Sequence, residues 1–232
     1  GGLTFNVSGT MNFNRSMNAN INLNGGAMCV TDNVTISGKI QHLANSIIFI
    51  APDKVLTYQG TVPVNVNELS LAVQGGGRFA SWDNNSIMLN KDGGILKLAD
   101  DATTLSHLTI EQSESTFESD KFLNVEASAV SNCAGDESTT EGSSTIVVEL
   151  LVQQGNSNLG LSALTELSLP NPFSVASQKS LTVSGDSGQL TLGGTLTFEN
   201  GSQFVLNSPG SKVSGVFDFL ENNTLDAQKS VS

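Results

Sequence analysis

Acidic side chains are the residues of this sequence best suited to chemistry, since the chain contains 22 of them and only 2 histidines. Two or three carboxylates on one face of a fold can perform the acid/base steps that cleave glycosidic bonds. The candidates form two groups, which are Asp83, Asp92, Asp100 and Asp101, and then Glu111, Glu114 and Glu118. Many random pairs among the acids have a comparable spacing. We therefore expect solvated loop acids here and assign no catalytic residue.

Other catalytic and metal-binding patterns are weaker still. His42 and His107 are far apart in the sequence, and we expect each to be a partly exposed strand residue. No Ser-His-Asp arrangement can be assembled with any specificity. Neither the spacing of an EF-hand loop nor a calcium-binding nonapeptide occurs. The sequence thus points to no cofactor-binding residue, no metal ligand and no cofactor.

Charge and composition restrict the partners. The net charge is −12 and the isoelectric point about 4.3, which argues against nucleic acid and against anionic membranes. Only 14% of the residues are charged, and the surface expected from the remaining Ser, Thr, Asn and Gly is typical of extracellular β proteins. Tyr58 and Trp82 are the only residues of their types, and this scarcity counts against a lectin. No apolar stretch is long enough for a membrane-spanning helix.

Residues 181–219 organise the rest of the chain. Apolar residues alternate with polar ones in short bursts, as in the pair Leu181 and Val183 and the pair Leu190 and Leu192. Such period-two alternation places one set of side chains on one face of an extended strand. Glycine and asparagine between the bursts supply the positive φ angles of sharp corners. This region is therefore expected to be a series of very short strands.

Similar units recur about every seven to nine residues along most of the chain. Three short strands per coil, with coils of roughly 20–25 residues, predict an all-β, single-stranded parallel β-helix (β-solenoid). One such domain would comprise residues 1–232. The alternative is an antiparallel β-sandwich, because Gly193 with Gly194 and Asn200 with Gly201 have the pattern of two-residue hairpins. A short helical turn over residues 162–167 is a further expectation.

Residues 128–144 are small, polar and acidic, and they predict an exposed loop. Cys133 lies in this loop, several coils away from Cys29. Because stacked strands are about 4.8 Å apart, the two cysteines would be on the order of 20–25 Å apart, too far for a disulfide. We therefore expect free thiols unless the loop folds back. Asparagines at alternate positions near the N-terminus, such as Asn6 and Asn22, suggest ladders between layers.

Two short motifs resemble a known family. Gly25, Gly26, Ala27 and Met28, followed by residues 34–38, resemble the GGA-type motif and the next strand of polymorphic outer-membrane autotransporter passengers. Residues 219–222 resemble the FxxN motif of that family, and residues 190–206 look like a generic autotransporter coil. The resemblance implies a right-handed β-helix, surface display and adhesion. The chain also begins with Gly1 and Gly2 rather than Met, which suggests a processed or excised product.

These observations leave three hypotheses of function. The first is a non-enzymatic, secreted or cell-surface β-solenoid, an adhesin or passenger segment that binds a host or cell-surface protein or glycan. The second is a structural subunit of a filament or coat that self-associates through the ends of the solenoid. The third is a tailspike-like polysaccharide depolymerase, for which Asp83 and Asp101 are the residues to test.

Overall fold

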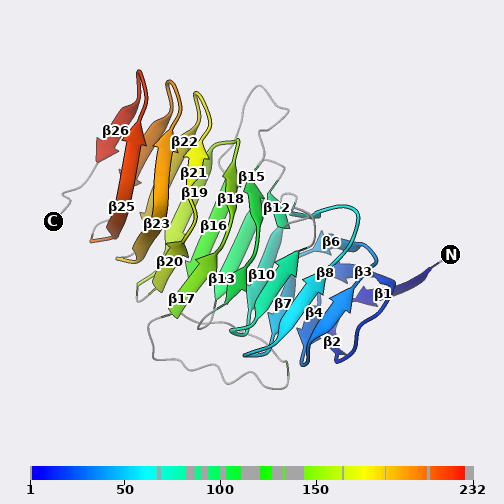
Figure 1. Cartoon of the computed structure of the whole chain (residues 1–232). Coiled ribbons are helices and arrows are strands. Elements are labelled where there is room, and N and C mark those ends of the chain that lie inside the picture. The colour runs from blue at the N-terminus through cyan, green and yellow to red at the C-terminus, as the bar shows by residue number, and fades with distance from the viewer. Residues whose placement is uncertain are drawn as a thin grey trace.

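The structure is a computed structural model (Figure 1). It describes residues 2–66, 69–81, 87–89, 94–99, 103–110, 121–126, 133, 144–163, 165–185, 187–207 and 210–227. The secondary-structure elements in these residues are all β-strands. The described residues hold no helix that could cross a membrane.

The strands form three sheets. Sheet A comprises β1 (Leu3–Val7), β3 (Ala19–Asn24) and β6 (Ile40–Ala44). Sheet B comprises, in spatial order, β2 (Thr10–Phe13), β4 (Ala27–Val30), β7 (Ser46–Ile50), β10 (Ser70–Gln74), β13 (Ile95–Ala99), β16 (Lys121–Glu126), β19 (Ser157–Leu161), β22 (Ser180–Gly185), β24 (Gln203–Asn207) and β26 (Thr224–Ala227). Sheet C comprises β5 (Val34–Ile36), β8 (Val55–Tyr58), β11 (Arg78–Ser81), β14 (Thr104–Leu105), β17 (Ser144–Val148), β20 (Thr165–Leu169), β23 (Gln189–Phe198), β21 (Phe173–Val175), β18 (Leu151–Gln153), β15 (Leu108–Ile110), β12 (Ile87–Leu89) and β9 (Val64–Val66), with β25 (Lys212–Phe219) paired to β23.

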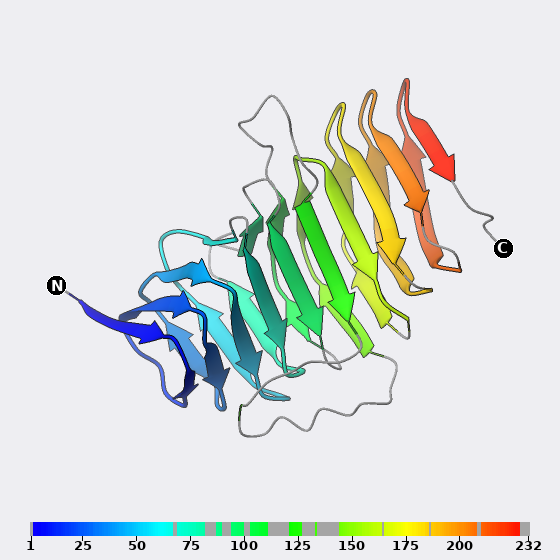
Figure 2. The ribbon, with the colours of Figure 1, turned by 180° about the vertical axis from the view of Figure 1, so that it is seen from behind.

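All strand pairings in the described chain are parallel. From β7 to β21, each pass of the chain crosses sheet B once and then adds two strands to sheet C. Each of the last two complete passes instead adds one longer strand, β23 or β25. The layers succeed one another from the N-terminal end to the C-terminal end, and Figure 2 shows the same stack from behind. The predicted single-stranded parallel β-helix is confirmed, and the antiparallel sandwich is excluded because neighbouring strands run in one direction.

An apolar ladder inside the stack explains the period-two alternation of the sequence. Each member pairs with the next in sheet B, in the order Leu71, Leu96, Leu123, Leu159, Val183 and Leu206. The first five of these side chains are 0% exposed. Equivalent positions in successive coils therefore bury the same face of every strand, and the core is continuous from layer to layer.

Coil length varies along the stack. The expected period of roughly 20–25 residues holds in the middle, where Ser46 pairs with Leu71 and Leu71 pairs with Leu96. The first coil is shorter, since Leu3 pairs with Ala19. The coil that contains Cys133 is longer, since Leu108 pairs with Leu151.

Polar corner residues join neighbouring layers. The Asn33 side-chain oxygen accepts a hydrogen bond from the backbone N–H of Val55 at 2.9 Å, one coil further on. Asn45 binds the N–H of Ser70 in the same way at 2.8 Å. The predicted asparagine ladder is confirmed at one place, where the Asn22 amide donates to the Asn6 side-chain oxygen at 2.7 Å. Corner side chains thus accept hydrogen bonds from backbone N–H groups at the first residues of the strands.

Glycines allow these corners to stack closely. Gly25 has a φ of +87°, which favours glycine. A Cβ atom at Gly26 would lie 2.3 Å from the carbonyl oxygen of Gly9 in the coil below. The two glycines of the GGA-type motif therefore serve the sharp bend and the close contact between layers.

This contact predicts that Gly26→Ala destabilises the protein by about 1–3 kcal/mol, because the added methyl group must push the backbone of Gly9 away. Gly9→Ala is the matched control, since a Cβ atom there has no neighbour within 4 Å. Chemical denaturation of the two variants measures the difference. Equal midpoints for Gly26→Ala and the wild-type protein would contradict the described packing of these corners.

A local feature of the alternative sandwich and one local expectation are both wrong. Gly193 and Gly194 do not form a hairpin but lie within β23, where the register with β25 shifts between Thr191 and Thr195. A Cβ atom at Gly194 would lie 2.3 Å from the nitrogen of Pro172, so this glycine permits close stacking rather than chain reversal. The helical turn over residues 162–167 is also absent from the described residues there, since β20 begins at Thr165.

The expectation of free thiols is wrong as well. Cys29 and Cys133 form a disulfide, with their Cα atoms 5.6 Å apart. Cys133 therefore lies beside β4, several layers away from β16, the strand that precedes it in the sequence. There Cys29, Cys133, Ala27 and Phe49 form a small apolar cluster outside the main core. The estimate from stacking distance failed because Cys133 is not part of the stack.

The predicted exposed loop over residues 128–144 is only partly described. Cys133 is buried at 6% exposure, and Ser144 already belongs to β17. Residues 128–132 and 134–143 lie outside the described residues.

Candidate functional site

The carboxylates considered for glycan cleavage cannot be placed. Asp83, Asp92, Asp100, Asp101, Glu111, Glu114 and Glu118 all lie outside the described residues. Within the described residues, no three His, Cys, Asp or Glu side chains gather closely enough to hold a metal ion.

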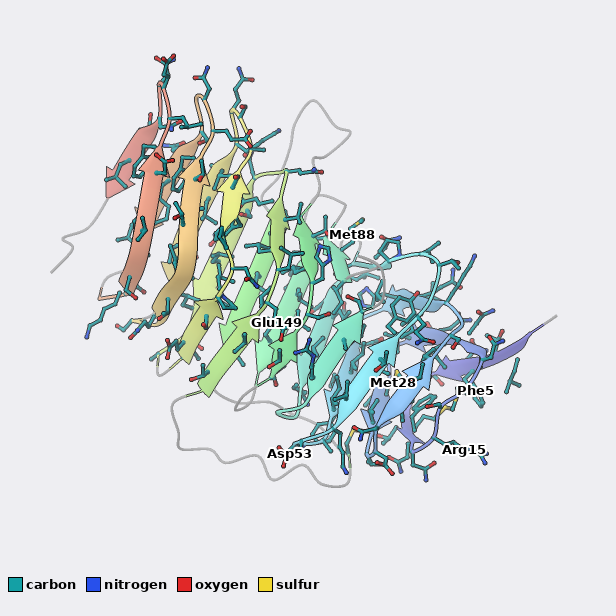
Figure 3. The ribbon with its side chains drawn as sticks, in the orientation of Figure 1. Phe5, Arg15, Met28, Asp53, Met88 and Glu149 are labelled. Carbon is teal, nitrogen blue, oxygen red and sulfur yellow. A yellow bond between two sulfur atoms is a disulfide. The ribbon has the colours of Figure 1, made fainter. Side chains whose placement is uncertain are left out.

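One described acid, Glu149, joins three coils on sheet C. Its carboxylate binds the guanidinium of Arg78 through both oxygens, and the contact of Nη2 with Oε2 measures 2.6 Å. The carbonyl of Glu149 accepts a hydrogen bond from the Asn171 amide at 2.5 Å. Arg78 begins β11, whereas Glu149, labelled in Figure 3, directly follows β17. Because both oxygens are engaged by one cation, this carboxylate fits the role of a structural tie.

A second acid on sheet C is also engaged. The hydroxyl of Thr191 on β23 donates to Glu166 on β20 at 2.6 Å, so this pair too links neighbouring layers. These two acids on the outer side of sheet C therefore already have partners in the protein.

The two histidines are buried, so the expectation of partial exposure is wrong. His42 is 6% exposed and His107 is 8% exposed. His42 lies on the inward side of β6, opposite Leu23, and its Nε2 is 3.1 Å from the carbonyl oxygen of Ser70. Since a carbonyl only accepts, Nε2 carries the hydrogen and donates. Burial lowers the pKa of both histidines, partly offset at His42 by its bonds to the backbone.

These pKa shifts predict a contribution to stability that is lost on acidification. Below the ordinary histidine value of 6.5, the unfolded chain binds protons that buried His42 and His107 do not. The stability therefore falls as the pH decreases through this range, by about 1.4 kcal/mol for each unit by which burial lowers a pKa.

The measurement compares thermal midpoints of the wild-type protein and His42→Gln at pH 7.5 and pH 5. The variant should lose less stability than the wild-type protein, because its amide does not titrate. Comparing the two proteins cancels the change in charge of the many carboxylates. An equal loss in both would contradict a contribution from His42.

Sheet B carries a different outer surface over its last coils. It is formed by outward residues of β19, β22 and β24, which we call the sheet B surface: Asn158, Gly160, Thr182, Ser184, Val205 and Asn207. All six are at least partly exposed, and none is charged. The Ser184 hydroxyl donates to Asn158 at 2.5 Å, which fixes the positions of two neighbouring side chains.

This surface can form hydrogen bonds without displacing an ion pair. Hydroxyl and amide groups recur there in neighbouring layers, so they match ligands with several hydroxyl or amide groups in a row. The sequence alone did not predict a site on this surface. The sequence hints at this surface only through the polar residues that alternate with apolar ones in residues 157–161 and 180–185. Most other strands of the chain show the same alternation.

A scan of protein-family models, a search of curated proteins and a search of solved structures each found no match to this chain.

Proposed function

We propose that this chain is a non-enzymatic β-solenoid of a secreted or cell-surface protein, an adhesin or passenger segment. The disulfide between Cys29 and Cys133 is the observation that supports a location outside the reducing interior of the cell. Such bonds persist in oxidising surroundings and are rare in reducing ones. The scarcity of charge and the neutral polar surface agree with this assignment.

The adhesive part of the proposal rests on the sheet B surface. Neutral donors and acceptors in consecutive layers suit a glycan or an extended protein segment, whose polar groups recur along one direction. On the outer side of sheet C, by contrast, Glu149 already binds Arg78 and Glu166 already accepts a hydrogen bond from Thr191, each across layers. We therefore assign binding to sheet B rather than to sheet C.

The experiment is binding of the purified, oxidised protein to a panel of immobilised glycans and extracellular-matrix proteins. Thr182→Arg places a large charged side chain on the sheet B surface and should reduce binding at least tenfold. Ser168→Arg is the matched control, because Ser168 is a partly exposed residue of β20 on sheet C. Equal loss in both variants, or no binding to any member of the panel, would reject this surface as an adhesive site.

A further inference from the structure

The two ends of the solenoid leave strand edges that the described chain does not cover. Sheet B ends at β2 on one side and at β26 on the other, and sheet A ends at β1. β25 pairs with β23 and with no other described strand. The first and last strands, β1 and β26, lie at opposite ends of the stack (Figures 1 and 2). Because all strands are parallel, the edge at one end has the backbone pattern that complements the other.

The C-terminal end exposes side chains that are core residues one layer below. Leu225 pairs with Phe204 but is 62% exposed, whereas Phe204 is 4% exposed. Phe219 is 41% exposed and stacks on the fully buried Phe198, with ring centroids 4.8 Å apart. Among the described residues, no further layer covers the inward side chains at this end.

The N-terminal end has the same property. Leu3 is 60% exposed although it pairs with Ala19, which is 2% exposed. Phe5 and Met11 are only partly buried, although Ile21, the partner of Phe5, is 0% exposed. Figure 3 places Phe5 at this end of the stack.

The inward residues of the two ends have the same spacing along the chain. At the C-terminal end they are Phe217, Phe219 and Leu225, and at the N-terminal end they are Leu3, Phe5 and Met11. The interval from Phe219 to Leu225 equals the interval from Phe5 to Met11. The strands also start alike, since β26 begins at Thr224 and β2 begins at Thr10. One placement of a second copy can therefore align inward residues on two sides of the stack at once.

Charge permits this contact although the whole chain carries −12. Arg15 is the only charged residue in residues 1–31, so the N-terminal coil carries no acid. The last two strands and the turn between them carry Asp218, Glu221 and Asp226, together with Lys212. Contact between two C-terminal ends brings acids together, whereas contact between unlike ends does not.

We propose that a second copy of this chain docks head to tail, with β1 and β2 of one copy continuing the sheets beyond β25 and β26 of the other. Leu3, Phe5 and Met11 then lie over Phe217, Phe219 and Leu225. The contact is heterologous, so it leaves one free end on each side and extends into open chains of molecules. This inference is independent of the proposed adhesive surface, which lies on the side of the stack.

The test uses two variants that each block one end. Leu3→Lys blocks the N-terminal end and Leu225→Lys blocks the C-terminal end, and both positions are exposed, so the fold tolerates the change. The wild-type protein should show a mass that rises with concentration above 24.2 kDa in sedimentation, and linear particles in electron microscopy. Each variant alone should associate at least tenfold more weakly. Their equimolar mixture should form dimers and nothing larger, because one intact end of each kind remains.

Leu150→Lys is the control, because Leu150 is an exposed leucine on the side of the stack and should leave assembly unchanged. Added salt should strengthen assembly by screening the net negative charge. A wild-type protein that remains monomeric at every concentration would overturn the proposal. So would self-association of either blocked variant at the wild-type level, or a loss of assembly in Leu150→Lys.

Discussion

Cys133→Ser is expected to lower the free energy of unfolding by about 2–5 kcal/mol, which is among the largest effects of any single substitution in this chain. The disulfide joins residues 104 positions apart and closes a long loop in the unfolded chain. Loop-closure entropy increases with loop length, so a link of this span restricts the unfolded state strongly. The substitution also removes the cover from Cys29 and Phe49, which are 0% and 1% exposed in the oxidised protein.

Denaturant titrations with and without a reductant measure this effect. Reduction of the wild-type protein should lower the midpoint as much as Cys133→Ser does, and the reductant should leave the midpoint of the variant unchanged. Cys29→Ser is the matched control and should give the same loss, because it removes the same bond. A wild-type midpoint that does not respond to the reductant would contradict the described disulfide.

Leu167→Ala is the second substitution with a large expected effect. Leu167 is 0% exposed and stands between Ile146 and Leu190 in the apolar ladder of sheet C. Removing its side chain leaves a cavity between two layers. Each of these layers is held in place by the next layer on its other side, so the cavity cannot close. Such changes typically cost about 2–5 kcal/mol, and layers that cannot collapse give the larger values.

Ser168→Ala is the control for this prediction. Ser168 is the next residue of β20, but it points outward, so the change should stay within about 0.5 kcal/mol. Hydrogen exchange should show that amides of β17, β20 and β23 open more easily in Leu167→Ala than those of distant coils, because each layer contacts only its neighbours. Similar unfolding energies for both variants would contradict the assignment of the inward and outward faces of this strand.

The parallel winding could be predicted because its signal is repeated many times. Each coil contributes its own alternation, as in Leu181 with Val183, and an error at one position does not alter the period. The presence of sharp corners between strands could also be predicted, since asparagine and glycine favour them. Gly193 and Gly194 show the limit of this signal. A glycine pair permits a hairpin but also permits close stacking on Pro172, and the sequence does not distinguish the two uses.

Features that depend on contacts outside the stack could not be predicted. The bond of Cys133 to Cys29 joins a residue between β16 and β17 to a strand several layers away, and no local pattern encodes that pairing. The burial of His42 has a similar origin, because its partner is a backbone carbonyl of Ser70 rather than a recognisable side chain. The sheet B surface was missed for a different reason: neutral polar residues occupy the outward positions of most strands.

The distance between spin labels at Thr191 and Thr197 tests the central claim of parallel winding most directly. The native cysteines are joined in the oxidised protein, so labels attach only to cysteines introduced at these two positions. Both residues belong to β23, and a continuous strand separates their backbones by about 20 Å. A hairpin at Gly193 and Gly194 would instead bring them to about 5–8 Å. The winding described here requires the long distance, and the short one would contradict it.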